Sequence, residues 1–116
     1  MKHKIFGRKF SRDIKQRTAL LRALTTSVLT HRRIETTISK AKSVAQIVEK
    51  MITKAKKKDI NSIRFLKSYL YTDEAVENAF TFAKEHEARN GGYTRVVRTR
   101  IRKADASVMA IIEVIQ

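Results

Sequence analysis

Residues 39–58 read SKAKSVAQIVEKMITKAKKK, and this stretch carries the clearest helical pattern in the 116-residue chain. Apolar residues recur in it every three or four positions, so a helix would bring them to one side. They are Ala41, Val44, Ala45, Val48, Met51, Ile52 and Ala55. The opposite side would carry Lys40, Lys42, Gln46, Lys50 and Lys54. We therefore predict a helix that follows a Ser39 cap, with one apolar and one cationic side.

The residues before this helix predict an arm, another helix and a short strand. Residues 1–10 are basic and have no clear period, so we expect an extended arm. Ser11 is a suitable cap for a helix over about residues 11–30, and Asp13 suits the first turn of that helix. Residues 33–38 alternate and are rich in β-branched side chains, which favours a strand.

Two further helices are expected in the middle of the chain. Either Asp59 or Asn61 can begin the first of them, and Thr72 can cap the second. The residues expected to face the core are Ile63, Leu66, Leu70, Val76, Ala79, Phe80 and Ala83. Asn90-Gly91-Gly92 should end this helical part, because glycine is a strong helix breaker.

After that break the period of the sequence changes to that of β-strands. Residues 93–101 and 108–115 predict two strands, and the short turn between them favours an antiparallel hairpin. The first strand should join them in one sheet with helices stacked on it. The predicted fold class is therefore α+β: two-layer α/β in the order α-β-α-α-α-β-β, with a small three-stranded mixed sheet. No Gly/Ser/Pro-rich linker divides the sequence, so residues 11–116 are expected to form a single domain after the arm of residues 1–10.

Positive charge dominates the composition. Lys and Arg number 26 against 11 Asp and Glu, which gives a net charge of +15. A compact body with this charge repels itself, so a polyanionic partner is predicted. An acidic membrane could attract the chain too, but no segment has the roughly 20 apolar residues that span a bilayer.

The charge is also uneven along the chain. Residues 1–33 carry ten basic side chains and one acidic side chain, whereas residues 59–88 carry three basic and six acidic ones. We therefore expect one face of the molecule to contact a polyanion. The face formed by the third and fourth helices should turn toward water or protein.

The predicted hairpin contains a row of arginines. Arg98, Arg100 and Arg102 alternate, so they should share one face of the strand, with Arg95 on the other face or near the edge. Such a row can follow a nucleic-acid backbone.

The Gly91-Gly92 pair precedes this strand. It lacks the Lys-Ser/Thr of a Walker loop and the spacing of a dinucleotide motif. We therefore expect a tight turn that lets the backbone approach RNA closely. The next residue, Tyr93, can stack on a base or pack on the core, and packing is the favoured alternative.

Neither a metal site nor a catalytic site is predicted. The histidines His3, His31 and His86 are scattered and the chain has no Cys. His3 and His31 lie in basic stretches, which favours phosphate or base contacts, whereas His86 is expected at the surface. The carboxylates cluster only in places typical of helix ends and surfaces. We therefore expect no enzyme activity and no cofactor.

Four segments resemble one protein family. They are Gly-Arg-Lys-Phe-Ser-Arg at residues 7–12, His-Arg-Arg-Ile-Glu-Thr-Thr at 31–37, Arg-Asn-Gly-Gly-Tyr-Thr-Arg-Val at 89–96, and Met-Ala-Ile-Ile-Glu at 109–113. In this order and spacing they are similar to the seventeenth large-subunit ribosomal protein family, which is bacterial and mitochondrial. One departure is Ala104-Asp105, where the family commonly has Gly-Asp, and it predicts a different turn in the hairpin.

The resemblance implies the same element order in two layers and a structural role in the large ribosomal subunit. It also implies binding to large-subunit ribosomal RNA near the outer side by the tunnel exit, beside neighbouring ribosomal proteins. We expect a monomer within the ribosome, in the cytoplasm or in a mitochondrion. The residues expected to bind RNA are Lys2, His3, Lys4, Arg8, Lys9, Arg12, Arg17, Arg22, His31, Arg32, Arg33, Lys40, Lys42, Arg89, Gly91, Gly92, Tyr93, Arg95, Arg98, Arg100, Arg102 and Lys103.

Two other functions compete with this hypothesis. One is a free nucleic-acid-binding protein, of the nucleoid or RNA-chaperone type. The expected strand between the first two helices argues against a helix-turn-helix, and no aromatic pair of an RNA-recognition module is present. The other is a protein–protein adaptor that uses the acidic helices, which leaves the basic surface unexplained.

Overall fold

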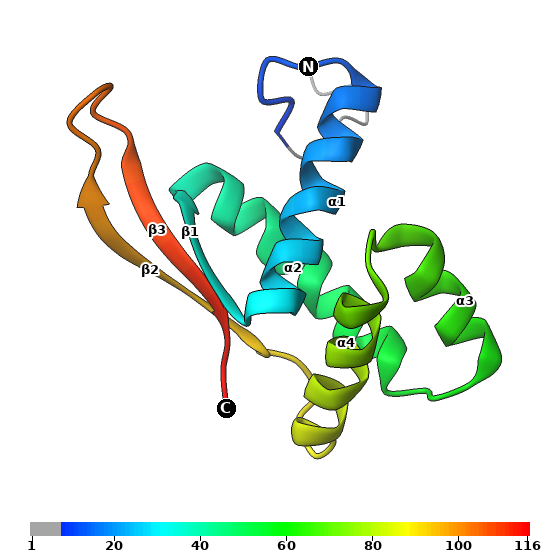
Figure 1. Cartoon of the computed structure of the whole chain (residues 1–116). Coiled ribbons are helices and arrows are strands. Elements are labelled where there is room, and N and C mark those ends of the chain that lie inside the picture. Colours follow the sequence, from blue (N-terminus) through cyan, green and yellow to red (C-terminus); the bar gives the residue numbers. More distant parts are fainter. Residues whose placement is uncertain (1–7) are drawn as a thin grey trace, which may run out of the picture.

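A computed structural model describes residues 8–116, so the predicted RNA contacts Lys2, His3 and Lys4 lie outside the described residues. The element order is the predicted one (Figure 1). The elements are α1 (Ile14–His31), β1 (Arg33–Thr37), α2 (Ile38–Ala55), α3 (Ile60–Tyr69), α4 (Asp73–Glu85), β2 (Thr94–Ile101) and β3 (Val108–Val114). The α+β class is confirmed.

The three strands form one sheet in the order β1-β3-β2. Both pairings are antiparallel, so the prediction of a mixed sheet is wrong in this detail. The reason is the central position of β3. β1 and β2 run in the same direction, but β3 lies between them, and no parallel pair forms.

The helices cover one face of this sheet. α2 packs against all three strands, and α1 contacts β1 and β3. α4 packs on α1 and α2, and α3 packs on α2 and α4, away from the sheet (Figure 1). The tip of the hairpin between β2 and β3 projects beyond the helices. Within the described part of the chain, no helix is long and apolar enough to cross a membrane.

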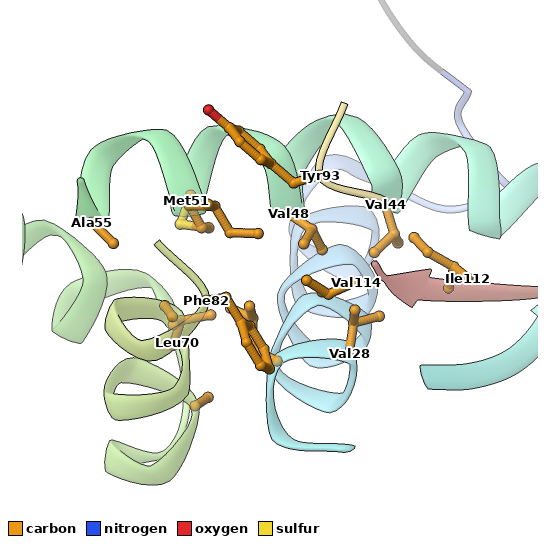
Figure 2. Close-up of a cluster of buried hydrophobic side chains, with 14 of the residues drawn as sticks. Val28, Val44, Val48, Met51, Ala55, Leu70, Phe82, Tyr93, Ile112 and Val114 are labelled. Carbon is orange, nitrogen blue, oxygen red and sulfur yellow. The ribbon is translucent and has the colours of Figure 1, made fainter. Parts of the chain in front are cut away.

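The core lies around the apolar side of α2, as its sequence predicted. Val44, Val48 and Ile52 are fully buried. They meet side chains from α1, α4 and β3 (Figure 2). Fully burying an aliphatic side chain of this size contributes about 1.5–3 kcal/mol, so this stripe is a main source of the stability of the fold.

Two helix caps differ from the prediction. α1 is capped by Asp13, whose Oδ1 accepts a hydrogen bond from Gln16 N at 2.8 Å, and not by Ser11. Ser11 instead has φ +54°, within a turn that precedes the helix. α2 begins two residues earlier than expected, with Thr37 at the cap position instead of Ser39. Ile38 accordingly belongs to the helix and not to the strand.

The other two caps follow the sequence. Asp59 caps α3 by accepting a hydrogen bond from Ser62 N at 2.8 Å, which decides between Asp59 and Asn61. This bond also lowers the pKa of Asp59. Thr72 caps α4, as predicted, through a hydrogen bond of 3.2 Å from Ala75 N.

The predicted burial of two residues, Ile63 and His86, is wrong. Ile63 was expected in the core but is 38% exposed, because α3 buries only the narrow edge that carries Ser62 and Leu66. His86 was expected at the surface but is only 4% exposed. Its ring lies edge-on to Tyr93, with 5.5 Å between the ring centroids, and its Nδ1 lies 2.9 Å from Phe82 O.

Candidate nucleic-acid interface

The described end of the arm folds back onto the helices. Arg8 Nη1 donates to Ser39 O at 3.2 Å and to Ser43 Oγ at 2.9 Å, both at the start of α2. Arg12 Nη1 donates to Phe10 O at 2.8 Å. The arm is thereby attached to the cationic side of α2, where Lys42, Lys50 and Lys54 are exposed.

Arg22, a predicted RNA contact, is engaged within the protein. Its Nε donates to Tyr69 O at 2.7 Å and its Nη2 to Ser68 O at 3.0 Å. The guanidinium also lies over the rings of Tyr69 and Tyr71, at 5.5 and 4.7 Å from their centroids. Arg22 therefore joins α1 to the last residues of α3 and to Tyr71, which follows that helix.

Arg32, another predicted RNA contact, likewise has internal partners. Its guanidinium donates to Val114 O at 3.0 Å and Ile115 O at 3.1 Å, and pairs with Glu85 at 2.8 Å. It also lies 4.8 Å from the centroid of the Phe82 ring. Arg32 thus connects the end of α1 to α4 and to the end of β3.

Two more arginines lie on the sheet face that the helices leave open. Glu113 is in register with Arg33 on β1 and with Arg95 on β2. Its neighbour Ile112 is buried in the core, so Glu113 points to the open face. The hydrogen bond from Arg95, with the nearby charges of Arg33 and Arg32, lowers the pKa of Glu113. Arg95 Nε lies 2.8 Å from Glu113 Oε1.

A β-bulge separates the arginines that were expected to share a face. Arg98 pairs with Ala110 and Ile101 with Val108, so β2 has one extra residue between these pairs. Arg98 shares the side of buried Ala110, whereas Arg100 reaches Glu35 at 3.0 Å on the open face. The prediction of one continuous arginine row is therefore wrong, because the bulge interrupts the alternation.

Arg102 belongs to the hairpin turn. Its Nη2 lies 2.7 Å from Asp105 Oδ2, and this hydrogen bond lowers the pKa of the Asp105 carboxyl well below its usual range. Ala106 has φ +59°, in the left-handed region that glycine adopts most readily. The turn thus places its left-handed residue just after Asp105.

Gly91 and Gly92 form the expected tight turn before β2. Their φ angles are +123° and +67°, and the space beside each Cα is open. Tyr93 anchors the turn, because its hydroxyl donates to Arg89 O at 2.9 Å and its side chain is 2% exposed. The packing role of Tyr93 is confirmed. Its burial corrects the assignment of Tyr93 to the RNA-binding residues, since the ring is closed to a base.

A further set of predicted contacts carries positive charge or a histidine without an internal partner. Within residues 8–116 their side chains make no hydrogen bond or ion pair. They are Lys9, Arg17, His31, Lys40, Lys42, Arg89, Arg98 and Lys103. They come from the arm, α1, α2, the Gly91-Gly92 turn and the hairpin, so one partner would have to touch several elements.

Lys50 on α2 and Lys57, two residues beyond the end of that helix, were not among the residues expected to bind RNA. With Lys54 they border a hollow of about 550 Å³ that Phe65 and Gly91 also line. Lys54 Nζ lies 5.0 Å from the centroid of the Phe65 ring. The helical spacing of these lysines was the signal that could have identified them. In the part of the chain that the structure describes, no group of three His, Cys, Asp or Glu could hold a metal ion.

Comparisons with known proteins show which family the chain belongs to. The chain matches the model of the family described as ribosomal protein L17 over residues 20–115. The large ribosomal subunit protein bL17 of Symbiobacterium thermophilum is 46% identical over 92% of this chain and 96% of the relative. The protein of that name from Campylobacter fetus is 43% identical over 99% of this chain and 98% of the relative. The protein of that name from Thermodesulfovibrio yellowstonii is 43% identical over 97% of this chain and 86% of the relative.

Proposed function

The chain belongs to the ribosomal protein L17 family, a structural and non-enzymatic family of the large ribosomal subunit, and we propose that it acts there by binding and stabilising large-subunit ribosomal RNA. The cationic side chains that have no partner within residues 8–116 carry this proposal. They occur on five parts of the molecule, which suits RNA that surrounds the protein better than a single flat contact.

The proposed contacts differ in how far the protein itself already engages them. Lys9, Arg17, Lys40, Lys42 and Arg98 offer whole positive charges to phosphates. Arg8, Arg33, Arg95 and Arg100 are partly committed to groups of the protein, so they would contact RNA with their remaining donors. Arg22 and Arg32 act mainly within the fold. Lys2, His3 and Lys4 in the arm extend the same interface.

We further propose a location on the outer side of the subunit by the tunnel exit, beside neighbouring ribosomal proteins, as a monomer. α4 begins with Asp73 and Glu74 and also exposes Glu77, which suits a side turned away from RNA phosphates. The relatives named above are all bacterial, which favours the cytoplasmic ribosome.

Gradient sedimentation of a lysate that contains the tagged full-length protein tests the function. We expect the protein to sediment with large subunits and to remain with them in moderate salt. A protein that stays at the top of the gradient while large subunits sediment would contradict the proposal. It would favour the second candidate, a free nucleic-acid-binding protein.

A further inference from the structure

A cavity of about 610 Å³ lies between α1 and α2, next to the point where the arm returns to the helices. The arm contributes Arg8 and Phe10, and Tyr69 at the end of α3 borders the cavity on another side. Its volume is within the range of about 300–1,000 Å³ that is typical of ligand sites. We call it the arm pocket.

The rim of the arm pocket is cationic. Arg17 of α1 and Lys42 of α2 both line it, and their side chains make no hydrogen bond or ion pair within residues 8–116. Arg8 is held at the rim by its hydrogen bonds to Ser43 Oγ and Ser39 O. Three positively charged side chains therefore line the same cavity, and hydrogen bonds hold one of them in place. This arrangement suits a phosphate group.

The interior of the arm pocket has a different chemistry. Leu21 and Ile47 are half-buried and pack against the core. Phe10 and Tyr69, which are half-buried, add aromatic rings, and the exposed Gln46 adds an amide at the opening that can both donate and accept hydrogen bonds. A bare anion would contact the cations only, and it would leave this apolar lining in water. A duplex would present its backbone to the rim but could not fill the interior.

We propose that the arm pocket holds one unpaired nucleotide of the bound RNA, with its base among Leu21, Ile47 and Tyr69 and its phosphate at the cationic rim. The inference rests on the proposed function, because it specifies how the RNA is contacted. Unpaired bases stack on aromatic side chains and offer their edges to hydrogen-bonding groups. The arm pocket supplies both kinds of group beside three cations.

Chemical probing of ribosomal RNA in purified large subunits tests this inference. Thr18 lines the arm pocket from the exposed side of α1, so Thr18→Trp should fill it without adding charge. Ala23→Trp is the matched control, because Ala23 is an exposed residue of α1 outside the pocket. We expect one unpaired base to become several-fold more reactive in Thr18→Trp subunits than in wild-type or control subunits.

The outcomes separate this inference from the proposed function. Thr18→Trp protein that sediments with subunits at normal occupancy, with no base changed in reactivity, would overturn the pocket but not the ribosomal role. Absence of the wild-type protein from subunits would overturn the role itself.

A second measurement covers the case in which Thr18→Trp fails to fold or assemble. Methyl NMR of the wild-type full chain would follow Leu21 and Ile47 during titration with a single-stranded oligoribonucleotide, a blunt RNA duplex or inorganic phosphate. We expect only the single strand to shift both methyl signals saturably. Equal shifts with the duplex or with phosphate, or no shift with any probe, would refute an unpaired nucleotide in the arm pocket.

Discussion

At the scale of single residues, the arginines of this chain divide into two kinds that the sequence does not distinguish. Arg22 and Arg98 both lie in basic, patterned segments. Arg22 is enclosed by backbone carbonyls and two tyrosine rings, whereas Arg98 has no internal partner in residues 8–116. The difference depends on which distant residues each one meets. Tyr69 lies 47 positions from Arg22, beyond the reach of any local pattern.

This difference predicts a large effect of one substitution on the free energy of unfolding and a small effect of the other. Arg22→Ala should lower the free energy of unfolding by about 1–3 kcal/mol, because it leaves the Tyr69 and Ser68 carbonyls without their charged donor. Arg98→Gln should change it by less than about 0.5 kcal/mol, as is usual at such surface positions. Urea denaturation of both purified variants would measure the two values. Equal losses of unfolding free energy in the two variants would contradict the distinction between a structural Arg22 and a surface Arg98.

For RNA binding the order should be reversed: a substitution of Arg98 should have the larger effect, and a substitution of Arg22 the smaller one. Each phosphate contact that is lost reduces the slope of log affinity against log salt by roughly 0.7–0.9. With large-subunit ribosomal RNA as the ligand, Arg98→Gln should make the slope shallower by the equivalent of about one phosphate contact. Arg22→Lys should leave the slope near its wild-type value. Filter binding at four or more salt concentrations would give the slopes. An unchanged slope in Arg98→Gln would exclude a phosphate contact at this position.

At the scale of elements, the sequence predicted the helices and strands well where one period dominates. The stripe of α2 and the change of period after Gly92 are local signals, and both correspond to observed elements. The bulge in β2 and the central position of β3 were missed. Both depend on pairing between strands, which the alternation within one strand does not encode.

The sheet provides a prediction about pH. The folded-state pKa of Glu113 is lowered mainly by the hydrogen bond from Arg95, so its charged form stabilises the fold. This contribution is fully present above the unfolded pKa, near the ordinary value of 4.5, and is lost as the pH falls through the lowered folded value. Glu113→Gln should therefore flatten the acid side of the stability–pH curve.

Thermal unfolding of Glu113→Gln between neutral and acidic pH would measure this effect. Glu77→Gln on α4 is the control, because Glu77 is exposed and its side chain has no partner within the described range. The control should keep the wild-type pH dependence. A parallel loss of stability with acid in wild type and Glu113→Gln would show that the Arg95–Glu113 pair does not contribute.

At the scale of the whole molecule, the uneven charge of the sequence predicted which elements are basic and which are acidic. It did not predict which of the basic side chains are paired within the protein. The acidic segment of residues 59–88 forms α3 and α4, which pack away from the sheet. The predicted RNA contacts that have no partner within residues 8–116 lie instead on the arm, α1, α2, the Gly91-Gly92 turn and the hairpin. The sequence could not show how much of the positive charge is neutralised internally, since Glu35, Glu85, Glu113 and Asp105 each pair with an arginine only after folding.

The arm provides the last prediction, because its sequence is highly charged and its described residues 8–10 are mostly exposed. None of residues 8–10 belongs to the hydrophobic core, and Arg8 contacts α2 through exposed polar groups. Deleting residues 1–10 should therefore leave the unfolding midpoint in urea nearly unchanged, while removing five of the basic or histidine side chains proposed for RNA contact. We expect the truncated protein to fold normally but to show reduced occupancy in large subunits when it competes with the full-length chain. Normal occupancy would mean that α2 and the hairpin are sufficient for RNA binding, and it would remove the arm from the interface.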